Sequence, residues 1–211
     1  MTQPIEYVTI VEPVLEVTLI GTADRAVWAP HLDLDARTAD PVTVVLSAVE
    51  TTYMGVRFRE LSLSLLLDDA KGILVHAFNS SRVFAFIERQ MFHTPYYYAA
   101  ISVTARHIHL ATQGQPLLDA RLPDTAPVER SADECREWQL TLPTTKPQYF
   151  YARLEGHTEY YACAGSTVQG FDHPAMPPAF TYLQQSNFRL HTWSVRTTAR
   201  HSKSKTYSRR K

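Results

Sequence analysis

The sequence predicts a mainly β fold, built from antiparallel strands with a few short helices and closed, or nearly closed, as a barrel or sandwich. Two observations lead to this prediction. About ten segments rich in β-branched and aromatic residues follow one another at short spacing. Only roughly two or three brief stretches have a helical pattern, and this proportion is typical of closed antiparallel architectures.

The composition favours one globular domain followed by a tail. The chain has 211 residues, 45% of them hydrophobic. We expect a single domain at 1–195 and a basic disordered tail at 196–211, which holds seven Lys or Arg and no acid. Residues 1–195 therefore carry 21 acids against 14 bases (21 less 7), a net charge of −7. Because this body is acidic, we expect no nucleic acid in the core, and we interpret the tail as solvated.

Two further features concern the cellular setting. No apolar run reaches the roughly 18 residues that would cross a membrane, and no signal peptide opens the chain. Cys135 and Cys163 are the only cysteines, and one possible bridge is no disulfide framework. We therefore expect a cytoplasmic protein without a membrane span.

The first half of the chain contains one strand of unusual clarity. Residues 1–20 predict one or two strands, 21–40 a mixed segment with a short helix, and 42–54 another strand. Val56–Leu67 (VRFRELSLSLLL) alternates with period two. That alternation puts Glu60 on a face otherwise made of apolar and small hydroxyl side chains. A carboxylate there is either paired or lines a cavity.

The next unit, residues 72–103, contains most of the residues that could carry chemistry. Ile73–Phe78 predicts a buried strand, and Asn79-Ser80-Ser81 can cap a helix. Apolar residues at spacings of three and four predict that helix over Arg82–Phe92. Pro95 ends the helical pattern, and the aromatic Tyr96–Val103 predicts a second strand, in which Tyr96 and Tyr98 share one face.

The remaining strands follow at short intervals. Ala100–Ala111 is predicted as one strand, on which His107 and His109 share a face. These histidines could be half of a metal site, but no nearby His, Asp or Glu completes an obvious set, so we expect no metal. No phosphate loop, hydrolase elbow or metal-type cysteine spacing occurs, and we expect no cofactor. Later strands are predicted at Leu117–Leu122, Glu137–Leu142, Tyr149–Leu154, Glu159–Ala164 and Asn187–Arg196, with a short helix at Ala179–Gln185.

Three passages together resemble the acetoacetate decarboxylase-like superfamily. VRFRELSLSL (Val56–Leu65) looks like the family strand that bears a cavity glutamate, and Glu60 takes that position. AFIERQMFHTPYY (Ala85–Tyr97) is similar to the segment in which an Arg-Glu pair precedes a spacer, a proline and the catalytic lysine. GSTVQGFDHPAMPP (Gly165–Pro178) resembles the family's late segment. The resemblance covers roughly residues 45–195 and implies an acetoacetate decarboxylase-like β fold that forms a homo-oligomer.

The chain departs from that family at the reactive position. The family's lysine after the proline forms a Schiff base with a 3-oxo acid. Here Tyr96 follows Pro95, and the charged pair is reversed to Glu88-Arg89. The chain therefore resembles a divergent branch that carries tyrosine at this position. Because no lysine is expected in a buried strand, we do not expect Schiff-base decarboxylation.

Two functions are weighed from these residues. The first is an enzyme that acts on a small carbonyl or carboxylate compound by non-covalent acid/base chemistry. Its catalytic residues would be Glu60 as general acid or base, Arg89 as the anion-holding cation and Tyr96 as the oxyanion donor. By the same resemblance, the substrate-binding residues would be Glu88, Phe92, His93 and Tyr98.

The alternative is a non-catalytic module that binds a small molecule in the same pocket. Its basis is the concentration of aromatic residues around the central unit, which suits an apolar or aromatic ligand. These residues are Phe78, Phe84, Phe86, Phe92, Tyr96 and Tyr98. A third interpretation makes Glu60 and Arg89 an internal ion pair that fixes the fold.

Overall fold

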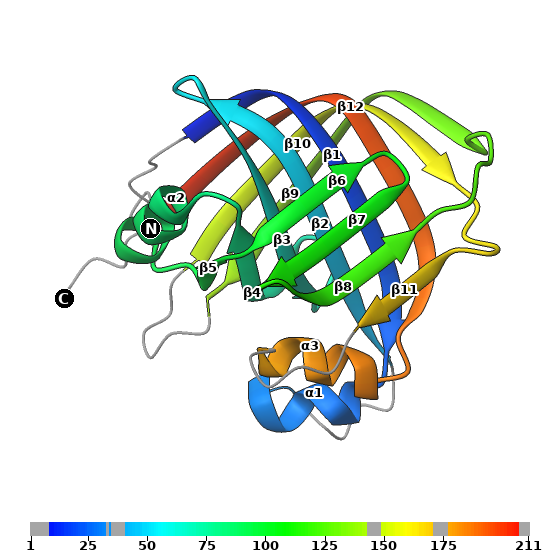
Figure 1. Cartoon of the computed structure of the whole chain (residues 1–211). Coiled ribbons are helices and arrows are strands. Elements are labelled where there is room, and N and C mark those ends of the chain that lie inside the picture. The colour runs from blue at the N-terminus through cyan, green and yellow to red at the C-terminus, as the bar shows by residue number, and fades with distance from the viewer. Residues whose placement is uncertain (1–8, 33, 35–40, 143–148, 171–176, 207–211) are drawn as a thin grey trace.

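Strands dominate the part of the chain that the structure describes. A computed structural model describes residues 9–32, 34, 41–142, 149–170 and 177–206. These residues form a large sheet, a small sheet and three α-helices, and Figure 1 shows their arrangement. The predicted mainly β class with few short helices is therefore confirmed.

The large sheet contains eight strands in the order β3-β2-β1-β12-β10-β9-β4-β5. An additional pairing joins β3 to β4, so seven of these strands form a closed ring. Strand β5 pairs with β4 and is not itself a member of the ring. All of its pairings are antiparallel except those of β4 with β9 and with β5. The strand bounds are β1 Thr9–Ala23, β2 Val42–Tyr53, β3 Val56–Leu66, β4 Lys71–Asn79, β5 Tyr96–Tyr98, β9 Glu129–Thr141, β10 Tyr149–Tyr161 and β12 Arg189–Thr206.

The ring closes through β4, which uses one edge for two partners. Its first residues, Lys71–Ile73, pair with β9, and its last residues, Ala77–Asn79, pair with β5. The opposite edge of β4 pairs with β3 along most of its length. Tyr96, the first residue of β5, is thereby brought beside Ala77 at the wall of the ring.

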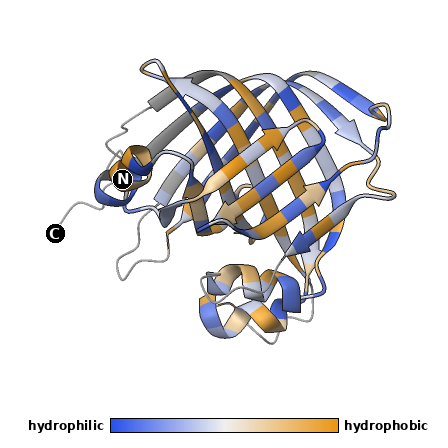
Figure 2. Ribbon diagram, viewed as in Figure 1, coloured by the Kyte–Doolittle hydropathy of each residue, from blue (hydrophilic) through white to orange (hydrophobic). Residues whose placement is uncertain are grey.

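The small sheet covers one side of the ring. It has the order β11-β8-β7-β6, with bounds β6 Ala100–Thr104, β7 His107–Thr112, β8 Gln115–Arg121 and β11 Thr167–Gly170. Helices α1 (Arg25–Leu32) and α3 (Pro178–Gln185) lie side by side below it in Figure 1. Figure 2 shows hydrophobic and hydrophilic residues alternating along the strands of both sheets, so each sheet can bury one face in the core between them. Trp28, Phe78, Phe180 and Trp193 belong to that core.

Local sequence signals explain the turns around β4. Asp68 accepts hydrogen bonds at Oδ1 from the backbone N–H groups of Ala70 and Lys71, which stabilises the turn between β3 and β4. Ser81 caps helix α2 (Arg82–Ile87) by accepting a hydrogen bond from the N–H of Phe84. The helix then continues as a π-helical turn, η1 (Glu88–Phe92), before Pro95.

Three predicted segments are corrected by the structure. Ala100–Ala111 is no single strand, because β6 and β7 form a hairpin around the turn Ala105-Arg106. The predicted strand over Tyr96–Val103 is divided into β5 and β6 at Ala99. The strands predicted separately at Tyr149–Leu154 and Glu159–Ala164 are joined in one strand, β10, which ends at Tyr161. Its pairing with β9 and β12 shifts register after Gly156.

The largest correction concerns the predicted disordered tail at 196–211. Strand β12 continues to Thr206 and pairs with both β1 and β10. Arg196 is 1% exposed, and His201 is also buried. Residues 196–206 therefore complete the ring, while 207–211 lie outside the described residues.

None of the helices in the described ranges is long and apolar enough to span a membrane. The helices are short, and α1 and α3 each have eight residues.

Candidate functional site

A small cavity lies inside the ring of strands, on the face opposite the small sheet. Strands β2, β3, β4, β9, β10 and β12 supply its wall, and β5 contributes one residue. Apolar side chains, three serine hydroxyls, one carboxylate and one imidazole line it. The lining residues are Val45, Ser47, Val49, Glu60, Ser62, Ser64, Leu74, Tyr96, Trp138, Leu140, Ala152, Leu154 and His201.

Strand register brings two carboxylates into one row across the ring, and one of them, Glu60, lines the cavity. Neighbouring positions across β12, β1, β2, β3 and β4 are Arg196, Glu16, Val49, Glu60 and Asn79. Directly paired residues of adjacent strands place their side chains on the same face of a sheet. The row therefore has an arginine and a glutamate at one end, and a glutamate and an asparagine at the other.

Glu60 is 5% exposed and is oriented by two neighbours. Asn79 Nδ2 donates to Glu60 Oε1 at 3.0 Å, and the Tyr96 hydroxyl donates to Glu60 Oε2 at 3.4 Å. The Asn79 amide is itself fixed, because its Oδ1 accepts the backbone N–H of Ser81 at 2.7 Å. The cap region of α2 thus holds the carboxylate at the cavity wall through Asn79.

Glu16 lies at the centre of a second buried cluster. It accepts hydrogen bonds from Thr18 Oγ1 at 2.6 Å and from Arg196 Nη1 at 2.8 Å. His201 Nε2 lies 3.2 Å from Glu16 Oε2, and His201 also lines the cavity. The second nitrogen of the guanidinium, Arg196 Nη2, donates to Glu134 Oε2 at 2.8 Å. The arginine therefore joins two carboxylates, and one of them holds the cavity histidine.

This cluster keeps both carboxylates ionised. Burial alone would raise the pKa of Glu16, but the hydrogen bond from His201 and the charges of His201 and Arg196 outweigh it and lower the pKa to about 2. Burial also opposes ionisation of Glu134, whose pKa is nevertheless lowered to about 2 by hydrogen bonds and by the charge of Arg136. The region beside the cavity thus holds fixed negative and positive charges that compensate one another.

The cavity volume limits what the site can hold. It is about 50 Å³, and a single water requires at least ~10–15 Å³ by the same measure. The space accepts a few water molecules or the reactive end of a small compound, and an aromatic ring does not fit unless side chains move.

The predicted site residues fall into two groups. Glu60 and Tyr96 meet at the cavity, whereas the other predicted residues are absent from its described lining. Arg89 is exposed, and its guanidinium lies 5.3 Å from the centre of the Tyr97 ring. Glu88 Oε2 accepts a hydrogen bond from Thr94 Oγ1. The remaining predicted residues, His93 and Tyr98, are exposed, and the side chain of Phe92 lies outside the described part.

The aromatic residues around the central unit do not gather at one pocket, because they lie in different parts of the molecule. Phe78 packs against Phe180 in the core between the sheets, and Phe84 packs against Phe58. Phe86 is exposed. Among the aromatic residues expected near a pocket, the described lining contains Tyr96, and Trp138 joins it from β9.

Sequence reasoning missed Glu16, Arg196 and His201. Arg196 and His201 belong to a basic, Ser-rich run that is typical of a solvated tail. One signal was available: residues 189–206 contain no Gly or Pro, so nothing in the sequence ends a strand that begins before Trp193.

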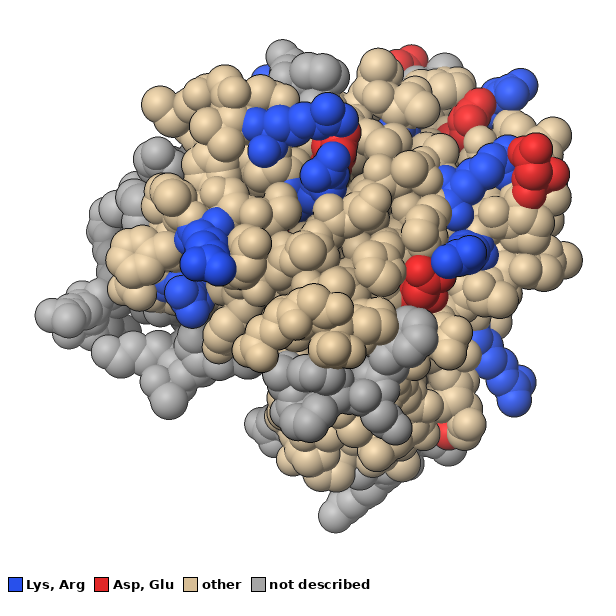
Figure 3. All heavy atoms as spheres, viewed as in Figure 1, with Lys and Arg blue, Asp and Glu red and all other residues tan. Residues whose placement is uncertain are grey.

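The charged surface adds little to the site. Figure 3 shows the molecule from the side of the small sheet, where Lys and Arg lie in separate groups among uncharged side chains. On this face the described residues form no continuous basic surface, which is what a nucleic-acid interface would require.

Comparison with known proteins bears on the fold. No family model matches the sequence, and no curated protein matches it. Solved structures are similar to this chain, and three of them share 11% identity with it. An acetoacetate decarboxylase-like enzyme from Sphingomonas wittichii RW1 has a TM-score of 0.56, with 93% of this chain and 91% of that chain covered.

The other two structures match over similar lengths. An acetoacetate decarboxylase has a TM-score of 0.62, covering 98% of this chain and 88% of that one. The enduracididine biosynthesis enzyme MppR, complexed with the condensation product of pyruvate and imidazole 4-carboxaldehyde, has a TM-score of 0.59, covering 99% and 90%. At this identity, the likeness concerns the fold.

Proposed function

We propose that this chain, which has the acetoacetate decarboxylase-like fold, is an enzyme that acts on a small carbonyl or carboxylate compound in the cavity of the ring. The observation that carries the proposal is the buried Glu60 carboxylate, held beside the Tyr96 hydroxyl at the cavity wall. A carboxylate in a small, mostly apolar cavity is suited to moving a proton to and from a bound compound.

The chemistry follows from the groups at the wall. Glu60 takes a proton from a carbon next to the carbonyl. The electron pair of the broken C–H bond forms a C=C bond with the carbonyl carbon, and the π pair of the C=O bond moves to the oxygen. The Tyr96 hydroxyl donates a hydrogen bond to that oxygen as it gains negative charge. Glu60 then returns the proton. His201, held by Glu16, provides a nitrogen that can bind a substrate carboxylate from the β12 side of the cavity.

The cavity size favours a short oxo acid over an apolar aromatic ligand. With about 50 Å³ of space and a wall that combines serine hydroxyls with Glu60 and His201, the site matches a compact polar compound better than a ring. The fold neighbours named for decarboxylase activity, and the one solved with a pyruvate-derived product, are in keeping with this substrate class.

Proton exchange at the carbon next to the carbonyl tests the proposal, because this measurement does not require the product of the reaction to be known. The protein is incubated in D₂O with small 2- and 3-oxo acids, and deuterium incorporation next to the carbonyl is followed by NMR. Wild-type protein should accelerate exchange for at least one acid. Glu60→Gln should lose this acceleration, and Tyr96→Phe should slow it by about 10²-fold or more. Glu137→Gln, on the exposed face of β9, is the matched control and should behave as wild type.

Borohydride trapping separates this chemistry from a covalent one. The side chain of Lys203 lies outside the described part, but its backbone pairs with Ala152, which lines the cavity. The proposal expects no reduced lysine adduct by mass spectrometry after borohydride treatment with any acid of the panel. An adduct on Lys203 would replace the non-covalent mechanism by a Schiff base. If all variants exchange at the wild-type rate, Glu60 has no catalytic role.

A further inference from the structure

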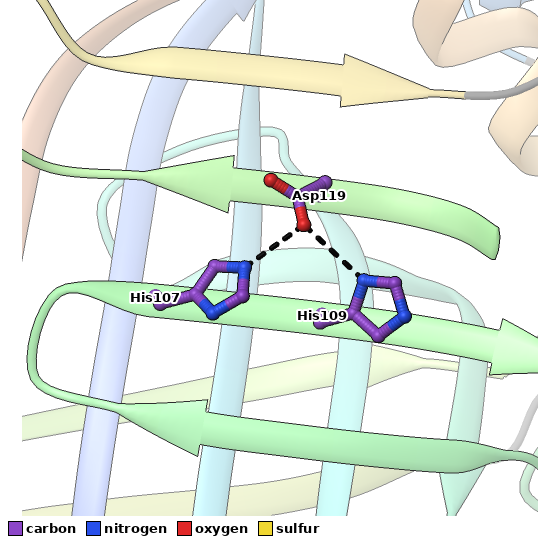
Figure 4. Close-up of side chains that lie close together, drawn as sticks. All are labelled: His107, His109 and Asp119. Atoms are coloured by element: carbon purple, nitrogen blue, oxygen red, sulfur yellow. Dashed lines mark hydrogen bonds and ion pairs between the residues drawn. The ribbon is translucent and has the colours of Figure 1, made fainter.

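The small sheet carries a cluster of ligand-type side chains that the cavity chemistry does not use. His107 and His109 lie on β7, and Asp119 lies beside them on β8, as Figure 4 shows. Their neighbours in the chain, Ile108 and Leu118, are fully buried in the core between the sheets. Because side chains alternate along a strand, the three residues occupy the opposite face, toward solvent.

The three ligand atoms are close to one another before any ion is added. His107 Nε2 lies 2.8 Å from Asp119 Oδ2, and His109 Nδ1 lies 3.2 Å from the same oxygen. All three ligand atoms lie within 4.8 Å of one another. In a tetrahedral zinc site, with bonds of about 2.0–2.1 Å, neighbouring ligand atoms are about 3.3 Å apart. Small side-chain rotations are therefore enough to admit an ion.

We propose that His107, His109 and Asp119 form a binding site for Zn²⁺ on the outer face of the small sheet. Two imidazole nitrogens and one carboxylate oxygen are a ligand set that zinc accepts, and such three-residue sites keep a fourth position open. His107 and His109 are 34% and 37% exposed at their side chains, so water can fill that position.

Arg121 supports the geometry and leaves the required oxygen available. Its Nε donates to Asp119 Oδ1 at 2.7 Å, which orients the carboxylate with Oδ2 toward the histidines. Metal ligands commonly have an outer hydrogen-bond partner of this kind. The Arg121 side chain is largely exposed, so solvent screens its repulsion of a cation.

The strand register shows that the cluster depends on an irregularity. The turn Gln113-Gly114 pairs Thr112 with Gln115 and Ala111 with Pro116, and the pairing then shifts by one residue to join Leu110 with Leu118. Regular pairing would have set Asp119 opposite Ile108, on the core side. The shift sets it opposite His109 instead.

Metal titration of the chelator-treated full-length protein tests this site. One equivalent of Zn²⁺ should bind in a calorimetric titration, and Co²⁺ should give the visible absorption bands of a four- or five-coordinate ion. His109→Ala and Asp119→Asn should each weaken binding by at least about 10-fold, because even outer partners of metal ligands have effects of 10–100-fold. His157→Ala, an exposed histidine on β10, is the matched control and should bind as wild type.

Two further readouts keep the outcome clear. Circular dichroism of the metal-free variants should match wild type, since the altered side chains lie on a solvent face. A cobalt spectrum with a thiolate charge-transfer band would assign the ion to Cys135 or Cys163 instead and overturn the proposal. The proposal is equally overturned if wild type binds no Zn²⁺, or if Asp119→Asn binds it as tightly as wild type does.

Discussion

Arg196→Met should destabilise the protein far more than an ordinary arginine substitution. Arg196 is 1% exposed and is bonded to Glu16, which is equally buried, and to Glu134. Methionine has a similar length and carries no charge, so the change leaves both carboxylates without their shared cation. Removal of one partner from a buried pair costs about 3–5 kcal/mol.

The lowered pKa of Glu16 sets the pH dependence of this effect. The change from 4.5 to about 2 corresponds to ~3 kcal/mol of stability, since each pKa unit is worth about 1.4 kcal/mol. A lowered carboxyl pKa stabilises the folded protein above about pH 4.5, and that contribution is lost as the pH falls toward 2. That energy belongs to the whole cluster, because His201, Arg196 and Thr18 together lower this pKa against the effect of burial.

The assay is equilibrium unfolding by urea at pH 7 and at pH 3, with thermal melts alongside. At pH 7 the melting temperature of Arg196→Met should fall by roughly 7–11 °C, because a chain of this length has an unfolding entropy of about 0.44 kcal/mol/K. At pH 3 the difference from wild type should shrink, because Glu16 takes up a proton in the variant. Arg200→Met, an exposed arginine on the same strand, should change stability by less than about 0.5 kcal/mol. If Arg196→Met loses the same unfolding free energy relative to wild type at both pH values, the loss does not arise from the ionised Glu16.

Two other substitutions test the packing of β4. The His76 ring is stacked on Tyr97, its Nε2 is buried without a hydrogen-bond partner among the described residues, and burial lowers its pKa to about 4. The unfolded chain therefore takes up this proton first, so wild type should lose up to ~3 kcal/mol between about pH 6.5 and 4. His76→Phe should lose less in urea titrations at the two pH values, and equal losses would contradict this account. At Gly72 an added Cβ would lie 2.4 Å from the Leu65 carbonyl oxygen, so Gly72→Ala should lower stability by about 1–3 kcal/mol. If the melting temperature of Gly72→Ala equals that of wild type, β4 accommodates the added Cβ without loss of stability, and this prediction is wrong.

Local patterns in the sequence predicted where Glu60 and Tyr96 lie. Alternation along β3 set Glu60 among small and apolar side chains, and the structure buries it at a cavity wall with Ser62 and Ser64. The order of helix, Pro95 and tyrosines predicted a strand over Tyr96–Val103, and the first residue of that strand, Tyr96, reaches Glu60. These features depend on periods of two and on caps, which a single sequence displays.

The rest of the site depends on which strands become neighbours. Glu16 and Arg196 are 180 residues apart in the chain, and they meet because β1 pairs with β12. Periodicity within a segment says nothing about its partner strand. Arg89 is absent from the described cavity lining for a related reason. It precedes Tyr96 in the same segment of the chain, but its guanidinium lies over Tyr97, which faces the other way.

The histidine pair shows a third limit. Regular pairing counted from the turn at Gln113-Gly114 would bring Asp119 opposite Ile108. The pairing instead shifts by one residue between Leu110 and Ala111, and Pro116, the partner of Ala111, lies at that shift. Such a bulge decides which face each later residue occupies.

The pairing of β1 with β12 also orders events during synthesis of the chain. Strand β1 emerges from the ribosome first and β12 last among the described elements, so the ring cannot close until almost the whole chain is available. Until then Glu16 has no guanidinium beside it, and the nascent ring has two open edges, β1 and β10. Contacts at such long separation slow folding, and open edges invite pairing with other chains. The early strands of this protein therefore present unpaired edges until β12 has been made.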